Sequence, residues 1–113
     1  MNPDERQFLL TAAWLFLRHG RRDRALAVCE ALSEEDPRDG VVAVALAELL
    51  LSRGEPARAL ESLRPAAVPP ALAHAEAVLE TRGLQALGRR DEAVARWKRY
   101  LASRKGAERQ WMA

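Results

Sequence analysis

The sequence is poor in aromatic and β-branched residues and holds a single cysteine. Aromatics make up only 5% of its 113 residues, and Ala and Leu provide most of the 49% that are apolar. Ala, Leu, Arg and Glu are strong helix formers, whereas β-branched residues favour strands. The lone Cys29 excludes an internal disulfide and offers no cysteine metal site. We therefore expect an all-α protein without a bound metal.

The chain also lacks a long apolar run and a strong charge of one sign. The apolar stretch VVAVALAELLL, residues 41–51, contains Glu48 and is shorter than the roughly 18–20 residues that cross a membrane. The opening MNPDERQ signals a helix start, with Asn2 as cap and Pro3 in the first turn, and is unlike a secretory signal. The net charge of +2 argues weakly about partners. We expect a soluble, cytoplasmic protein without direct membrane insertion.

Glycine recurs at an interval of 34 residues, and alanine recurs five positions after each glycine. The glycines are Gly20, Gly54 and Gly88, and the alanines are Ala25, Ala59 and Ala93. A fixed period of this length signals stacked helical hairpins. In such a hairpin the glycine ends the first helix in a left-handed conformation, and the small alanine lets the second helix approach the first closely.

Helical periodicity on both sides of each glycine predicts six helices in three hairpins. The expected helices cover 3–19, 22–35, 40–53, 56–65, 70–87 and 90–104, followed by a short tail. The repeats cover about 6–39, 40–73 and 74–107 within a single domain of residues 1–113. The Asp36-Pro37 and Pro69-Pro70 pairs separate successive hairpins, since a residue before proline avoids the helical conformation. Pro65 is expected to end the fourth helix early.

This arrangement, with Gly near the middle of the period, Ala five positions later and Pro near its end, resembles the tetratricopeptide repeat. The first repeat matches at Ala13, Phe16 and Pro37, and Cys29 takes the place of a bulky residue. The tryptophan that the family carries in its first helix is absent. The resemblance implies a short right-handed superhelix whose first helices line a concave groove.

The same resemblance assigns a set of side chains to that groove. The apolar ones are Leu10, Trp14, Leu17, Val41, Val44, Leu51 and Val78, and the cations are Arg18 and Arg82. An exposed apolar groove marks a site for a protein partner, and the arginines are expected to hold a carboxylate or a helix C-terminus. The alternative for Trp14 is packing between helices.

A basic stretch with a tryptophan, GRRDEAVARWKRYL at 88–101, raises the alternative of nucleic-acid binding. Acidic residues are interleaved with the basic ones, and the repeat register makes the stretch a second helix with Trp97 in its core. No nucleophile and acid accompany His19 or His74, so we expect neither catalysis nor a cofactor.

The tail after Leu101, ASRKGAERQWMA, differs from the polar capping helix that repeat stacks usually carry. Gly106 is expected to interrupt it. Trp111 and Met112 then either fold back as a partial cap or leave the end of the stack uncovered. A short stack of this kind is expected to gain stability from a bound partner.

Three repeats with no other domain are similar to the small chaperones of bacterial type III secretion systems, above all the SctY (YscY) group. The similarity is most specific over 5–37, with FLL, a first helix containing Trp, a basic turn and a closing Asp-Pro. It implies a cytoplasmic chaperone that forms a heterodimer with a small secreted partner, SctX, and engages the export gate SctV. The alternatives are a chaperone of the needle subunit, a generic adaptor of protein interactions and, least favoured, a nucleic-acid-binding protein.

Overall fold

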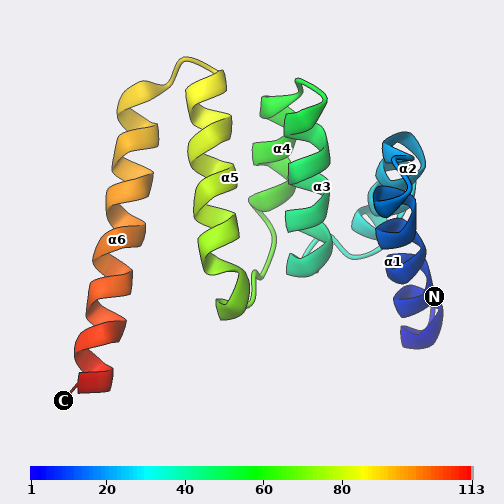
Figure 1. Cartoon of the computed structure of the whole chain (residues 1–113), viewed down its shortest axis with the longest axis horizontal. Coiled ribbons are helices and arrows are strands. Elements are labelled where there is room, and N and C mark those ends of the chain that lie inside the picture. Colours follow the sequence, from blue (N-terminus) through cyan, green and yellow to red (C-terminus); the bar gives the residue numbers. More distant parts are fainter. Residues whose placement is uncertain (113) are drawn as a thin grey trace.

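The computed structural model describes residues 1–112, and their side chains through Trp111. Within this range the chain forms six α-helices and a short 3-10 helix, η1. They are α1 (Pro3–Arg18), α2 (Arg22–Glu35), α3 (Gly40–Ser52), α4 (Pro56–Leu63), η1 (Pro70–Leu72), α5 (Ala73–Ala86) and α6 (Arg90–Met112). Figure 1 shows three antiparallel hairpins placed side by side. The prediction of an all-α chain of helical hairpins is confirmed.

Every hairpin turns at a glycine with a left-handed backbone. The φ angles are +71° at Gly20, +81° at Gly54 and +76° at Gly88. After each glycine, one N–H donates back across the turn: Arg21 to Phe16 O and Glu55 to Leu50 O at 2.8 Å, and Arg89 to Leu84 O at 2.9 Å. These bonds satisfy carbonyls that the helix end would otherwise leave without a donor. The alanines of the repeat, Ala25, Ala59 and Ala93, are all buried.

The helix ends differ from the predicted ones at two places. The helix α4 ends at Leu63, two residues earlier than expected and directly before Arg64-Pro65, and η1 precedes α5. The larger difference is at the tail, where α6 continues through Gly106 to Met112.

The prediction of an interrupted tail is therefore wrong. One glycine costs a helix only about 1 kcal/mol, and the surrounding Ala, Arg, Lys and Glu are strong helix formers. An ion pair between Arg104 and Glu108, at 3.4 Å, adds to the helical stretch. Trp111 is 91% exposed and does not fold back as a cap. The side chain of Met112 and residue 113, which the predicted tail also includes, lie outside the described part.

Gly40 allows the loop after α4 to pass close to the junction between α2 and α3. Ala67 N donates to Arg38 O at 2.9 Å, and a Cβ on Gly40 would lie 2.3 Å from Ala67 O. No other residue type fits at such a distance. The sequence analysis does not single out Gly40, because its partner lies 27 residues further along the chain.

The hairpins are packed unevenly along the stack. The helix α2 packs on α3, α4 packs on α5, and α3 also packs on α5, whereas α1 and α3 come into close contact at few points. Hairpin 1 (α1 and α2) is thus joined to hairpin 2 (α3 and α4) mainly through its second helix. This leaves the side of α1 that faces α3 partly uncovered.

Candidate partner-binding groove

An apolar cavity of about 470 Å³ opens between α1 and α3. Its residues are Gln7, Leu10, Thr11, Ala13, Trp14 and Leu17 from α1, Cys29 from α2, and Val41 and Ala45 from α3. The cavity occupies the place where closer packing of the two first helices would otherwise fill the space. The structure thus brings together four of the predicted groove residues, Leu10, Trp14, Leu17 and Val41.

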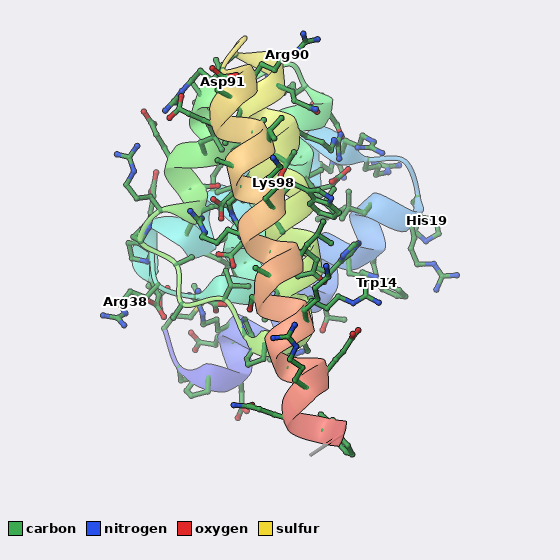
Figure 2. The ribbon with its side chains drawn as sticks, turned by 90° about the vertical axis from the view of Figure 1, so that its left-hand side faces the viewer. Trp14, His19, Arg38, Arg90, Asp91 and Lys98 are labelled. Atoms are coloured by element: carbon green, nitrogen blue, oxygen red, sulfur yellow. The ribbon has the colours of Figure 1, made fainter. Side chains whose placement is uncertain are left out.

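Trp14 is the most prominent side chain of this groove. It is 56% exposed, and the guanidinium carbon of Arg18 lies 4.8 Å from the centroid of its ring. Figure 2 shows Trp14 on the side of the molecule opposite Arg38, directed outward. Such stacking of a cation on a ring holds the indole in place while leaving it accessible. Trp14 lines the cavity and is not packed between helices.

Three of the predicted apolar groove residues lie outside the cavity. Val44 and Leu51 are half-buried and pack against the core, and Val78 of α5 is half-buried as well. The helix α3 is apolar on nearly every side because it is surrounded by other helices. Repeat position alone therefore does not decide which of its residues face the groove. The apolar surface is concentrated between hairpins 1 and 2.

The two predicted cations already have partners within the chain. Arg82 Nη1 donates to Glu48 Oε2 at 3.2 Å, and both side chains are about half exposed. Arg18 stacks on Trp14. Exposed ion pairs contribute about 0–1 kcal/mol, so a carboxylate of a partner can displace Glu48 at small cost. Their role as carboxylate-binding residues stays a prediction.

The floor of the cavity, formed by Ala13, Cys29 and Ala45, was missed by the sequence analysis. The signal was present: Cys29 is the repeat equivalent of Leu63 and Trp97, each 34 residues further along. A thiol in this bulky position leaves volume that a larger side chain would fill. Burial, with a smaller effect of Glu30, raises the pKa of Cys29 to about 11, so the floor stays neutral.

The basic stretch at the end of the stack packs largely against its own chain. The rings of Trp97 and Tyr100 lie 6.0 and 5.6 Å from that of His74, so the half-buried Trp97 joins α6 to α5. Arg96 Nε donates to Glu80 Oε2 at 3.1 Å. Burial and the charge of Glu80 together raise the pKa of the Glu76 carboxyl, which also lies 4.0 Å from Arg96. These contacts leave no continuous basic surface with stacking aromatics along the described part of α6.

Two further classes of site were searched for in the described residues. No cluster of three His, Cys, Asp or Glu side chains in residues 1–112 is arranged to hold a metal ion. None of the described helices combines the length and the apolar character that crossing a membrane requires.

Comparisons with known proteins point to one repeat family. A family model described as "Tetratricopeptide repeat" matches residues 16–78, which is more than half of the chain. The matched segment begins in α1 and ends in α5, and it includes Gly20, Gly54 and the cysteine of the cavity floor. A comparison with curated proteins finds no match.

Proposed function

The chain belongs to the tetratricopeptide repeat family, and we propose that it binds an apolar segment of a protein partner in the groove between α1 and α3. Repeats of this kind are protein-interaction modules that use concave surfaces for binding. One observation carries the proposal: Trp14 is 56% exposed beside an apolar cavity of about 470 Å³. A rigid aromatic side chain next to a pocket is the type of residue that carries most of the energy of an interface.

The lining of the cavity defines what the partner presents. Leu10, Leu17 and Val41 leave room for large apolar side chains and provide no charge to pair with. Gln7 lies at the edge of the cavity and can donate to, or accept from, the backbone of the bound segment. The partner segment is thus a helix or an extended chain with large apolar anchors, and it carries no charge at the anchor position.

We further propose that the partner is a small secreted protein of the SctX kind, and that the pair acts in the cytoplasm and engages the export gate SctV. The support is the similarity of residues 5–37 to the SctY chaperones of type III secretion. A chaperone that covers an apolar segment keeps an export substrate soluble, since exposed apolar patches promote association. The family match by itself supports the broader role, an adaptor of protein interactions.

The test of the groove is co-purification with two matched aromatic variants of α1. Trp14→Ala is expected to abolish capture of the partner, with the helical circular dichroism signal unchanged. Phe8→Ala serves as the control, because Phe8 lies on the same helix, is 72% exposed, and is outside the cavity. Equal loss of the partner in the two variants would show that the groove assignment is wrong. Unfolding of the Trp14→Ala variant would show that Trp14 is a core residue.

The identity of the partner is tested by mass spectrometry of what co-purifies from cells that carry the neighbouring genes. An SctX-like protein in a one-to-one complex supports the export role, and a needle subunit supports the alternative chaperone. Partners without a link to secretion would leave the adaptor role alone. The double variant Arg21→Glu with Arg22→Glu is expected to keep the partner. Loss of binding only in that variant, together with a steep dependence on salt, would favour a nucleic acid instead.

A further inference from the structure

We propose that copies of this chain associate head to tail, with the outer face of α6 of one copy packed on the outer face of α1 of the next. The new contact would continue the stack of hairpins across copies. It uses surfaces outside the groove between α1 and α3, so it does not depend on the proposed function. The argument comes from the 34-residue repeat, which gives each end surface an equivalent inside the stack.

The helix α1 exposes two large apolar side chains, Phe8 (72%) and Leu15 (46%). Their equivalents in the second repeat, Val42 and Leu49, are only 1% and 4% exposed, because α2 packs on α3. In the structure Leu49 lies beside Leu26 of α2. These positions of a first helix are therefore the ones that dock onto the preceding hairpin, and at the start of the chain nothing covers them.

The helix α6 carries the complementary surface at the other end. Val94 is 47% exposed and Leu101 is 37% exposed. The equivalents of Val94 are Leu26 and Leu60. Leu26 is only 4% exposed, and Leu60 packs on Gly83, where an added Cβ would lie 3.0 Å from Leu60 Cδ2. Figure 2 looks onto the uncovered side of α6, with Lys98 at its middle and no other described element in front of it.

The internal contacts also define the register of the proposed one. Leu26 lies beside Leu49, and Leu60 lies on Gly83, each pair joining a second helix to the following first helix. One further step along the repeat places Val94 beside Leu15 of the next copy. Because the two helices are antiparallel, the same register places Leu101 beside Phe8 and Lys105 beside Asp4.

The charges on the two faces are opposite in sign. Lys98 and Lys105 flank Leu101 on α6. On α1, a hollow of about 450 Å³ is lined by Met1, Asp4, Glu5, Phe8 and Leu9. A second copy therefore offers an apolar pair for Phe8 and Leu15 and cations for the acidic residues beside them. Such complementarity favours this partner and this orientation, and it is screened by salt.

An interface of this type joins two different surfaces and does not close on itself. Assembly is then expected to continue past the dimer as concentration rises. A symmetric dimer through α6 alone would bring Lys98 and Lys105 of both copies together, and like charges oppose that arrangement. The contrast between open and closed assembly makes the proposal testable with variants that block one end only.

The experiment measures the mass of the full-length chain by sedimentation or light scattering. The wild type is expected to grow in average mass with concentration, and to lose mass when salt is raised. Leu15→Glu and Val94→Glu are each expected to be monomeric alone. An equimolar mixture is expected to form a dimer and nothing larger, because each variant keeps one intact face. Ala31→Glu, at an exposed position of α2, is the control and is expected to behave as wild type.

Several results would overturn the proposal. These are a wild type that remains monomeric at about 1 mM chain, and a Leu15→Glu variant that still dimerises by itself. If either glutamate variant loses its helical signal, exposed charges replace it. Lys98→Glu with Lys105→Glu is expected to be monomeric, and mixing it with Asp4→Lys and Glu5→Lys is expected to restore association. Trp14→Ala should leave association intact, so this test and that of the groove fail independently.

Discussion

The carboxylate of Asp39 joins Arg6 of hairpin 1 to the first turn of α3. Arg6 Nε and Nη2 donate to Asp39 Oδ2 at 3.1 and 3.0 Å, and Nη2 also donates to Leu32 O at 3.1 Å. The other oxygen, Oδ1, accepts from Val41 N and Val42 N at 3.1 and 3.2 Å. One side chain thus caps α3 and holds the beginning of α1 against it. Since α1 and α3 touch at few other points, this contact sets the width of the groove at that end.

Substitution of Asp39 separates its two roles. Asp39→Asn keeps an oxygen for the cap and loses the ionic bond to Arg6, and it is expected to cost about 1–2 kcal/mol. Asp39→Ala also loses the cap and leaves the mostly buried Arg6 without its partner, so we expect about 2–4 kcal/mol. Urea denaturation measures both. Equal losses in the two variants would show that the cap contributes nothing.

Two glycines of the last hairpin are expected to respond in opposite directions to alanine. Gly88 has a φ of +76°, so Gly88→Ala forces a side chain into the left-handed region at about 1–2 kcal/mol. Gly106 lies within α6, and no atom lies within 4 Å of an added Cβ, so Gly106→Ala should stabilise the helix by about 0.5–1 kcal/mol. Thermal unfolding of both variants is the measurement. A destabilised Gly106→Ala variant would contradict the continuous helix.

The alanine register is tested by bulky substitutions at two positions of α4. Ala59 is fully buried at 0% exposure, and Ala57, two residues away, is exposed. Ala59→Trp overpacks the contact with the preceding helix and is expected to cost about 1–3 kcal/mol or more, whereas Ala57→Trp should be much milder. Denaturant unfolding compares the two. If they are equally destabilised, the 34-residue alignment does not describe the packing.

The reactivity of Cys29 reports on the floor of the cavity. Its pKa is raised from 9.0 to about 11, chiefly by burial, which lowers the thiolate population at pH 8 about a hundredfold. We expect a thiol reagent to label the native chain at least that much more slowly than the unfolded chain. Similar rates would show that the groove admits solvent to its floor. The native thiol also binds its proton more tightly than the unfolded one, so its contribution to stability is present below pH 9 and is lost as the pH rises through about 11.

Filling the cavity should separate binding from stability. Cys29→Leu places at this position the residue that the second repeat carries at Leu63, and the adjoining cavity of about 470 Å³ has room for it. The variant is expected to be as stable as the wild type and to bind the partner at least tenfold more weakly. Isothermal titration gives the affinity, and thermal unfolding gives the stability. Unchanged affinity would place the partner elsewhere.

Val44 shows where repeat position misleads about the groove. The sequence places it beside Trp14 in the groove, and the structure packs it against the core. Val44→Glu is thus expected to destabilise the chain, because it brings a charge into an apolar contact. The sequence alone would predict a variant that folds and merely fails to bind.

Local requirements of the backbone and of close packing were legible in the sequence. Gly20, Gly54 and Gly88 mark the turns because left-handed φ angles nearly demand glycine. The buried alanines follow because only small side chains fit where two helices approach. Pro65 shortened α4 for an equally local reason. Leu10, Trp14, Leu17 and Val41 reach the cavity as their repeat positions predict.

The tertiary structure decided what depends on the distance between helices. The cavity exists because α1 and α3 are held apart while α2 packs on α3, and because the small Cys29 occupies a bulky position between them. Val44 turned to the core because a helix that is apolar all round has no polar face to orient it. Gly106 did not break α6, since glycine permits a turn without imposing one. The direction that an apolar side chain faces is set by which neighbour buries it, and only the packed structure determines that neighbour.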